Sequence, residues 1–274
     1  MYRIAITADT HTGHLLGLTP PQKWDDTNRA WLEPLWNFYT KFAEDIGLVD
    51  EYILNGDSCA GLELKEPEMA LMPDLNDQLD MSVINTKVIR ARRRTFIAGT
   101  GYHDAQQASL DELLAQRFGT HAVDEDRINL PGGYEMHTRH VVGRSDTGYG
   151  WGTQDAKEIT NEILRAELED YRSADLLVRS HVHYCTGVWL ADGKRGRMRQ
   201  AFTTPALQLR GPKQGKYVRS RRAPIYHVGA VLIEKEKNLE PFVRPVIFPI
   251  SFYMTHEVRQ WLSTKRSTSA NRSK

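Results

Sequence analysis

The chain has 274 residues, 40% of them hydrophobic, which is enough to bury a substantial core. Its formal net charge of +1 gives no indication that the chain as a whole binds nucleic acid or an anionic membrane. No stretch approaches the roughly 18 consecutive apolar residues of a membrane span, and the two widely spaced cysteines argue against a disulfide framework, so we expect a cytoplasmic protein without membrane contact.

Short β-rich runs alternate with helical stretches from the first residues onward, which is typical of an α/β layered fold. Strands are expected at residues 3–8, 51–54 and 94–98. Between them we expect a helix over 28–47, ended by Gly47, and helical material within 75–93. A short helix over 109–118 is expected to begin with a capping box formed by Ser109 and Glu112.

The second half of the chain is richer in strands. A strand at 134–142 follows a turn signal, and then come a glycine-rich loop at 143–152, a helix at 155–172 and a buried strand at 176–179. Four further strands, at 186–191, 198–203, 226–234 and 243–248, are expected to form a second, antiparallel sheet. We therefore expect one domain over residues 1–262, followed by a basic, polar tail at 263–274.

Residues of metal-ligand type stand at the ends of four expected strands. The four segments are Asp9-Thr10-His11, Asn55-Gly56-Asp57, Gly99-Thr100-Gly101-Tyr102-His103-Asp104 and His181-Val182-His183. A separation of two residues lets the side chains of a D-x-H or H-x-H segment project toward the same side of a strand. One such segment alone would be explained by a turn-forming Asp or a half-buried His, but four in this order indicate a metal site.

In this order the segments resemble the calcineurin-like metallophosphoesterase superfamily, whose pattern is D-x-H, G-D, G-N-H-D/E, H and G-H-x-H. The matching part runs from residue 9 to residue 183. Segments 9–21 and 204–209 are similar to a group common in bacteriophage genomes, which would place the protein in the host cytoplasm. The resemblance implies an α/β fold with a layered β-sandwich core flanked by helices.

The resemblance also implies a set of ligands for two metal ions. Carried over residue by residue, Asp9, His11 and His183 would hold the first ion, Asp57 would bridge, and His181 with a middle His would hold the second. His137 and His140 are both candidates for the middle His, but they have opposite strand parity, so only one can face the site. We expect His140, because it lies nearer the end of the strand.

Two positions depart from the family pattern. Ser180 replaces the Gly before the final His pair, and the Asn of the third motif is replaced by Tyr102 or Thr100, depending on whether the match is anchored at His103 or at the strand end. Both substitutes are poorer neutral oxygen ligands than an amide carbonyl, so the second ion is expected to bind more weakly or to be completed by water. Imidazole and carboxylate ligands suit Mn²⁺, Fe or Zn²⁺ better than Ca²⁺ or Mg²⁺ and do not choose among the first three; of these, Mn²⁺ is our first choice.

The expected function is hydrolysis of a phosphate ester by a metal-activated water, with His103, oriented by Asp104, as general acid. Basic runs at residues 90–94 and 210–222, with Tyr217 to stack a base, favour a phosphodiester substrate such as DNA, RNA or a nucleotide. Such runs are also common on ordinary solvated surfaces, so a small phosphomonoester stays open. A third alternative is a non-catalytic metal-binding scaffold or partner-binding module of the same fold.

Overall fold

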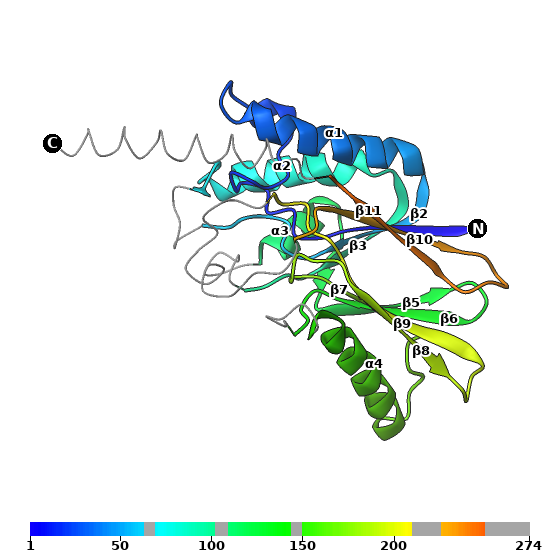
Figure 1. The fold of residues 1–274 in the computed structure, drawn as a ribbon. Helices are drawn as coiled ribbons and strands as arrows, with labels where there is room; N and C mark the ends of the chain where they lie inside the picture. Colours follow the sequence, from blue (N-terminus) through cyan, green and yellow to red (C-terminus); the bar gives the residue numbers. More distant parts are fainter. Residues whose placement is uncertain (63–68, 102–108, 144–149, 210–225, 250–274) are drawn as a thin grey trace.

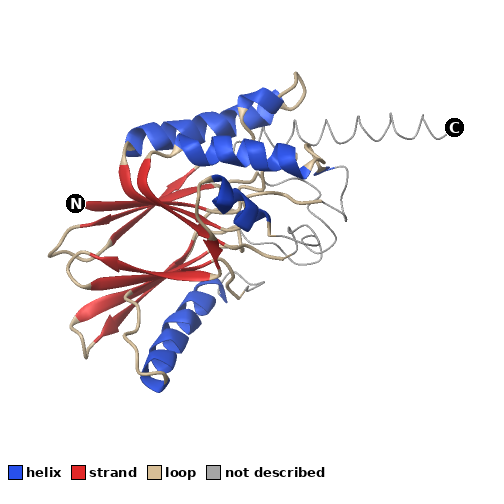
Figure 2. Cartoon of the chain, turned by 180° about the vertical axis from the view of Figure 1, so that it is seen from behind, coloured by secondary structure: helices blue, strands red, loops and turns tan. Residues whose placement is uncertain are grey.

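The computed structural model describes residues 1–62, 69–101, 109–143, 150–209 and 226–249, and within them two β-sheets face one another (Figure 1). The first sheet has six strands in the order β11-β10-β1-β2-β3-β4, and the second has five in the order β5-β6-β7-β9-β8. Helices cover the outer face of each sheet (Figure 2). The expected α/β sandwich flanked by helices is therefore confirmed.

The first sheet combines a parallel half with an antiparallel half. Strands β1 (Tyr2–Thr7), β2 (Val49–Asn55), β3 (Ala91–Ile97) and β4 (Ala122–Val123) are parallel, while β10 (Gly229–Lys235) and β11 (Phe242–Ile247) add antiparallel strands beside β1. Parallel neighbours need helical crossovers, and these are α1 (Arg29–Ile46), α2 (Leu75–Val88) and α3 (Leu110–Arg117). A one-turn 3-10 helix, η1 (Pro21–Lys23), precedes α1.

The second sheet also has a parallel centre. Strands β6 (Tyr134–Arg139), β7 (Leu176–Arg179) and β9 (Arg197–Thr203) run parallel, with β5 (Glu125–Leu130) antiparallel to β6 and β8 (Gly187–Asp192) antiparallel to β9. Helix α4 (Trp151–Leu168) lies against β8 and β9 on the outer face. The carboxyl ends of β6 and β7 consequently meet at one edge of this sheet.

Apolar side chains fill two layers. Alternation along β1 sends Ile4 and Ile6 into the layer between the sheets, while Ala5 faces the helices. Helix α1 buries an apolar stripe against the first sheet; its members are Trp31, Leu32, Leu35, Tyr39 and Phe42. Gly47 follows α1 with φ +61°, a left-handed conformation that ends the helix as expected.

The structure corrects the expected composition of the second sheet. Strands β10 and β11 belong to the first sheet, where Ile4 of β1 lies opposite Ile233 of β10, and only β8 and β9 of the four expected strands lie in the second. Almost every residue of β10 is buried, because β10 lies between β1 and β11 with both of its faces covered. Strands β4 and β5 were not expected, and α4 begins at Trp151 instead of residue 155.

The expected capping box of α3 does not form. Ser109 is the N-cap residue, but its side chain makes no capping hydrogen bond. The Glu112 carboxylate is occupied elsewhere, because it accepts hydrogen bonds from Ala122 N at 2.7 Å and Gln116 Nε2 at 2.8 Å. It therefore ties α3 to β4 instead of closing the first turn of its own helix.

Candidate metal centre

Six side chains expected to bind metal converge where β1, β2, β6 and β7 end, at one edge of the sandwich. Asp9 and His11 follow β1, Asp57 follows β2, His140 follows β6, and His181 and His183 follow β7. Because β1 and β2 are parallel neighbours in one sheet and β6 and β7 in the other, both sheets deliver ligands to the same edge. The structure places all six residues in two groups whose ligand atoms lie within 4.8 Å of one another.

The first group consists of Asp9, His11 and His183. Asp9 Oδ1 lies 3.0 Å from His183 Nε2 and 3.9 Å from His11 Nε2, and the two imidazole nitrogens are 3.4 Å apart. The side chains of these three residues thus bring their ligand atoms close enough together to bind one metal ion. This group matches the first ligand set that the family resemblance implies.

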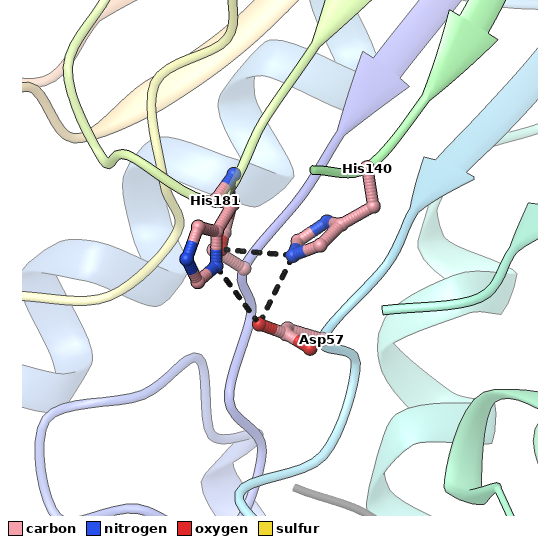
Figure 3. Close-up of side chains that lie close together, drawn as sticks. Asp57, His140 and His181 are labelled. Carbon is pink, nitrogen blue, oxygen red and sulfur yellow. Dashed lines mark hydrogen bonds and ion pairs between the residues drawn. The ribbon is translucent and has the colours of Figure 1, made fainter. Parts of the chain in front are cut away.

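The second group consists of Asp57, His140, His181 and again Asp9. His140 Nε2 lies 3.1 Å from Asp57 Oδ2, and His181 Nδ1 lies 3.9 Å from the same oxygen (Figure 3). Asp9 Oδ1 is 3.9 Å from His140 Nε2, so Asp9 contributes to both groups. The bridging role expected for Asp57 stays a prediction.

Hydrogen bonds on the far side of two imidazoles fix which nitrogen faces the site. His140 Nδ1 lies 2.6 Å from the backbone oxygen of Asn55, so Nδ1 carries the proton and Nε2 offers its lone pair. His183 Nδ1 is hydrogen-bonded to the Tyr226 hydroxyl, which donates in turn to Gln208 Oε1 at 3.2 Å. Both rings therefore direct Nε2 toward the site, and Nε2 is the nitrogen that a metal ion would bind in place of a proton.

The electrostatics of the site favour a cation. Asp9, Asp57 and His140 are all at most 2% exposed. Burial alone would lower the pKa of His140, but the carboxylates of Asp57 and Asp9 raise it to about 10. Burial would likewise raise the pKa of Asp9, but the charges of His183 and His140 lower it to about 2. The carboxylates thus stabilise positive charge inside the site.

The residues present fit a transition-metal ion. Within the described part of the chain, the buried Asp9 Oδ1 accepts no hydrogen bond, although it lies among three imidazole nitrogens. A buried carboxylate oxygen without a donor is costly unless a cation satisfies it. Imidazole nitrogen with carboxylate oxygen is a donor set that suits Mn²⁺, Fe or Zn²⁺ better than Ca²⁺ or Mg²⁺.

The backbone at the site is left-handed to an unusual extent. Of the non-glycine residues with positive φ in the described segments, all but Asp170 belong to the two groups: Asp9, His11, Asp57, His181 and His183, with φ between 40° and 70°. Such conformations cost L-residues free energy and concentrate at functional sites. The ligand-bearing turns are therefore held in place by their surroundings.

The structure separates the two candidates for the middle His. His140 lies in the second group, whereas His137 points to the opposite face of the second sheet, toward α4. There His137 Nε2 lies 3.2 Å from Glu125 Oε2, and its Nδ1 lies 3.6 Å from Glu162 Oε2. His137 on β6 and His140 just after it thus lie on opposite sides of the second sheet, and the role of His140 as a metal ligand stays a prediction.

The third motif is only partly described. His103, Asp104 and Tyr102 lie outside the described residues, as do 144–149, Tyr217 with the basic run 210–222, and the tail. Thr100 is described: its N–H donates to Asp57 Oδ1 at 2.6 Å, and its hydroxyl lies 3.1 Å from the same oxygen. Thr100 thus contacts a ligand of the second group.

Residues missed by the sequence reasoning support the ligands from behind. The carboxylate of Asp111 in α3 accepts hydrogen bonds from the backbone of the turns that follow β2 and β3. Asn55 Nδ2 donates to Ser180 Oγ at 2.6 Å, so Ser180 helps to join the two sheets next to the site. No sequence motif indicates either contact, because each joins residues that are distant in sequence.

Two of the four arginines in the basic run at residues 90–94 pair with acidic side chains. Arg93 lies 2.7 Å from the buried carboxylate of Glu51, and Arg92 lies 3.6 Å from Asp50. Both partners are on β2, the neighbouring strand, so these two arginines pair within the sheet. Among the described helices, none is long and apolar enough to cross a membrane.

Comparison with known proteins gives distant structural matches only. No family profile matches the sequence, and no curated protein matches it either. A metallophosphoesterase from Sphaerobacter thermophilus is 11% identical, covers 94% of this chain and 93% of its own, and has a TM-score of 0.41. Wild-type Vps29 from Entamoeba histolytica in complex with Zn²⁺ is 14% identical over 90% of this chain and 99% of its own, with a TM-score of 0.41.

A third solved structure, the sulfate thiohydrolase SoxB from Thermus thermophilus in complex with glycerol, is 10% identical over 97% of this chain and 61% of its own, with a TM-score of 0.42. Identities and TM-scores of this size assign no activity. The chemistry of the site therefore has to follow from the side chains that this chain itself brings together.

Proposed function

We propose that the protein is a metal-dependent phosphoesterase that hydrolyses a phosphate ester. The observation that supports this most is the convergence of ligand-type side chains from four strand ends into two adjoining groups that share Asp9. When bound there, two divalent transition-metal ions, Mn²⁺ by first choice and Fe or Zn²⁺ as alternatives, would supply Lewis acidity toward the phosphate and activate a water molecule. Asp57 is proposed to bridge the two positions.

The protein's own residues contribute orientation and a buried environment. Asn55 and Tyr226 hold the rings of His140 and His183 with Nε2 toward the site. Thr100 holds the Asp57 carboxylate through its N–H and hydroxyl. His181 is the most accessible ligand, with 42% of its side chain exposed, so substrate would approach from its side.

The leaving oxygen of the ester needs a proton or a hydrogen bond, and we assign that role to His103, oriented by Asp104. A phosphodiester of a nucleic acid or nucleotide is our preferred substrate, supported by the acid-free basic run at 210–222. The run at 90–94 supports it less, because Arg92 and Arg93 already have acidic partners. A small phosphomonoester is the alternative substrate.

A non-catalytic metal-binding scaffold is the alternative function, and one experiment separates the candidates. Elemental analysis of purified protein should find one or two transition-metal ions. Hydrolysis of bis-p-nitrophenyl phosphate and of p-nitrophenyl phosphate should then be compared after adding Mn²⁺. A faster diester reaction supports the proposal, a faster monoester reaction supports the alternative substrate, and bound metal without turnover supports the scaffold.

Asp57→Asn is the decisive variant, because Asp57 is proposed to bridge. It should abolish hydrolysis and lower the metal content, whereas Asp45→Asn, at an exposed ion pair with Lys41 on α1, should change neither. Protein that stays metal-free and inactive after Mn²⁺, Fe²⁺ and Zn²⁺ have each been added back would disprove the proposed function.

A further inference from the structure

The carboxylate of Asp111 connects two turns of the metal centre. Asp111 is the second residue of α3 and is 5% exposed. Its Oδ2 accepts hydrogen bonds from Asp57 N at 3.2 Å and Gly99 N at 2.8 Å, and its Oδ1 accepts one from Ser58 N at 3.1 Å. One buried side chain thus satisfies three backbone N–H groups from the turns that follow β2 and β3.

These N–H groups belong to backbone that cannot pair within the sheet. Gly56 and Asp57 have φ values of 82° and 51°, so the chain leaves the β2 ladder just before the ligand. A buried N–H without an acceptor costs free energy comparable to a lost hydrogen bond. Asp111 supplies the acceptor, while the carbonyl of Asp57 accepts from His11 N at 3.1 Å. The Asp57 peptide is therefore held from both sides.

The second turn acts on the Asp57 side chain. Asp111 binds Gly99 N, and the next residue, Thr100, donates its N–H to Asp57 Oδ1. The two turns approach so closely that a Cβ at position 99 would lie 2.1 Å from Asp57 Oδ1. Asp111 consequently fixes both the backbone of Asp57 and the residue that orients its carboxylate.

Anchoring of α3 does not require these bonds. Leu110, Leu114 and Ala115 are each at most 2% exposed and pack into the apolar layer beneath the helices. Burial of these apolar side chains already holds the helix to the sheet. The carboxylate of Asp111 is directed at the turns of the site instead.

We propose that Asp111 is a positioning residue for metal binding: acting through Gly99 and Thr100, it holds Asp57 in the conformation that binds the ion of the second group. The inference rests on the proposed function in that the wild-type protein must bind metal. Outer contacts of this kind change metal affinity by about 10–100-fold when they are removed.

Asp111→Asn tests the inference with little change in volume. An Asn amide turned either way directs its NH₂ group at backbone N–H donors, so at least one of the three hydrogen bonds is lost. Calorimetric titration of the metal-stripped protein with Zn²⁺ alone, and separately with Mn²⁺ alone, should show about 10–100-fold weaker binding at the second group, and at both groups if Asp57 bridges them.

Asp175→Asn is the matched control. Asp175 is also buried and also accepts a hydrogen bond from a backbone amide, Glu135 N at 2.9 Å, but it precedes β7 and so lies at the end of the sheet away from the site. This variant should lower the melting temperature and leave both metal affinities unchanged. A lower stability alone would thereby be distinguished from a positioning effect.

Thr100 supplies a second route to the same answer if Asp111→Asn does not fold. Thr100→Val removes the hydroxyl and should weaken the same metal site, and Thr100→Ser should restore it. Wild-type protein that binds no metal would disprove the proposed function. Wild-type binding together with unchanged affinity in Asp111→Asn, or in Thr100→Val if only that variant folds, would overturn this inference alone.

Discussion

Asp155 of α4 should make the stability of the fold depend on pH. The residue is fully buried; its Oδ2 accepts a hydrogen bond from Thr186 Oγ1 at 2.7 Å, and its Oδ1 has no partner among the described residues. Burial raises its pKa to about 7, and the negative charge of Glu158 adds to this rise. The hydrogen bond from Thr186 and the positive charge of Arg179 act in the opposite direction. The folded protein therefore keeps a proton on Asp155 at pH values where the unfolded chain has lost it.

The sign and size of the effect follow from this difference. Between the ordinary pKa of 3.8 and the folded value of about 7, the folded state binds the extra proton, so stability falls as pH rises through this range. At about 1.36 kcal/mol per pKa unit, the ionised carboxylate destabilises the fold above pH 7 by at most about 4 kcal/mol. Roughly 2–3 kcal/mol of this penalty should develop between pH 5 and pH 8.

Urea unfolding of the wild type and of Asp155→Asn, with EDTA present to remove metal, measures this contribution. The variant should gain stability relative to the wild type as pH rises from 5 to 8, because Asn keeps an acceptor for Thr186 and cannot ionise. Asp192→Asn is the control. Burial alone would raise the pKa of Asp192, but the hydrogen bond from Arg199 lowers it, so Asp192 stays ionised between pH 5 and pH 8. The difference in stability between this variant and the wild type should therefore be constant over this range. A pH-independent difference for Asp155→Asn would refute the reasoning.

Two further predictions concern the imidazoles. His140→Ala should lower metal content in elemental analysis, whereas His137→Ala should leave metal content unchanged and lower the urea midpoint, because His137 is buried beside Glu162; metal loss in both variants would contradict this. Tyr226→Phe removes the hydroxyl that fixes the His183 ring, and binding at the first group should weaken by about 10–100-fold in a calorimetric titration. An unchanged affinity would show that the ring needs no such contact.

The fold could be predicted from the sequence as far as local patterns reach. Hydrophobic periodicity gave α1 and its end at Gly47, and β-rich runs gave the strands that carry the ligands. Alternation within a strand tells which residues share a face, but it does not tell which sheet the strand joins. For that reason β10 and β11 were assigned to the wrong sheet, and the two-residue strand β4 left too short a pattern to recognise.

The convergence of the candidate ligands could be predicted because they follow strands whose carboxyl ends meet at one edge. The residues that hydrogen-bond to these ligands or to their turns could not be predicted. Asp111 is 54 positions from Asp57 and 12 from Gly99, and an acid in the first turn of a helix is commonplace. Tyr226 lies 43 positions after His183 and belongs to no motif. Only the tertiary structure shows which side chains stand behind a ligand.

The turns that carry the candidate ligands have a backbone geometry that the sequence did not indicate. The sequence placed Asp9 and His11 on one side of the site by the two-residue period of an extended strand, but β1 ends at Thr7 and both ligands have left-handed φ values. Left-handed backbone costs L-residues roughly 1–2 kcal/mol each, so it persists only where neighbouring groups impose it.

Crossed hydrogen bonds between the turns supply that constraint. Asp9 N donates to Gly56 O at 3.0 Å, His11 N donates to Asp57 O at 3.1 Å, and the backbone N–H of His181 donates to Asp9 Oδ2 at 3.2 Å. These bonds tie the turn after β1 to the turns after β2 and β7, while Asp111 of α3 adds hydrogen bonds to the turn after β2. The convergence of Asp9 and His11 is therefore a property of the assembled edge of both sheets, and a change in one turn should disturb ligands contributed by the others.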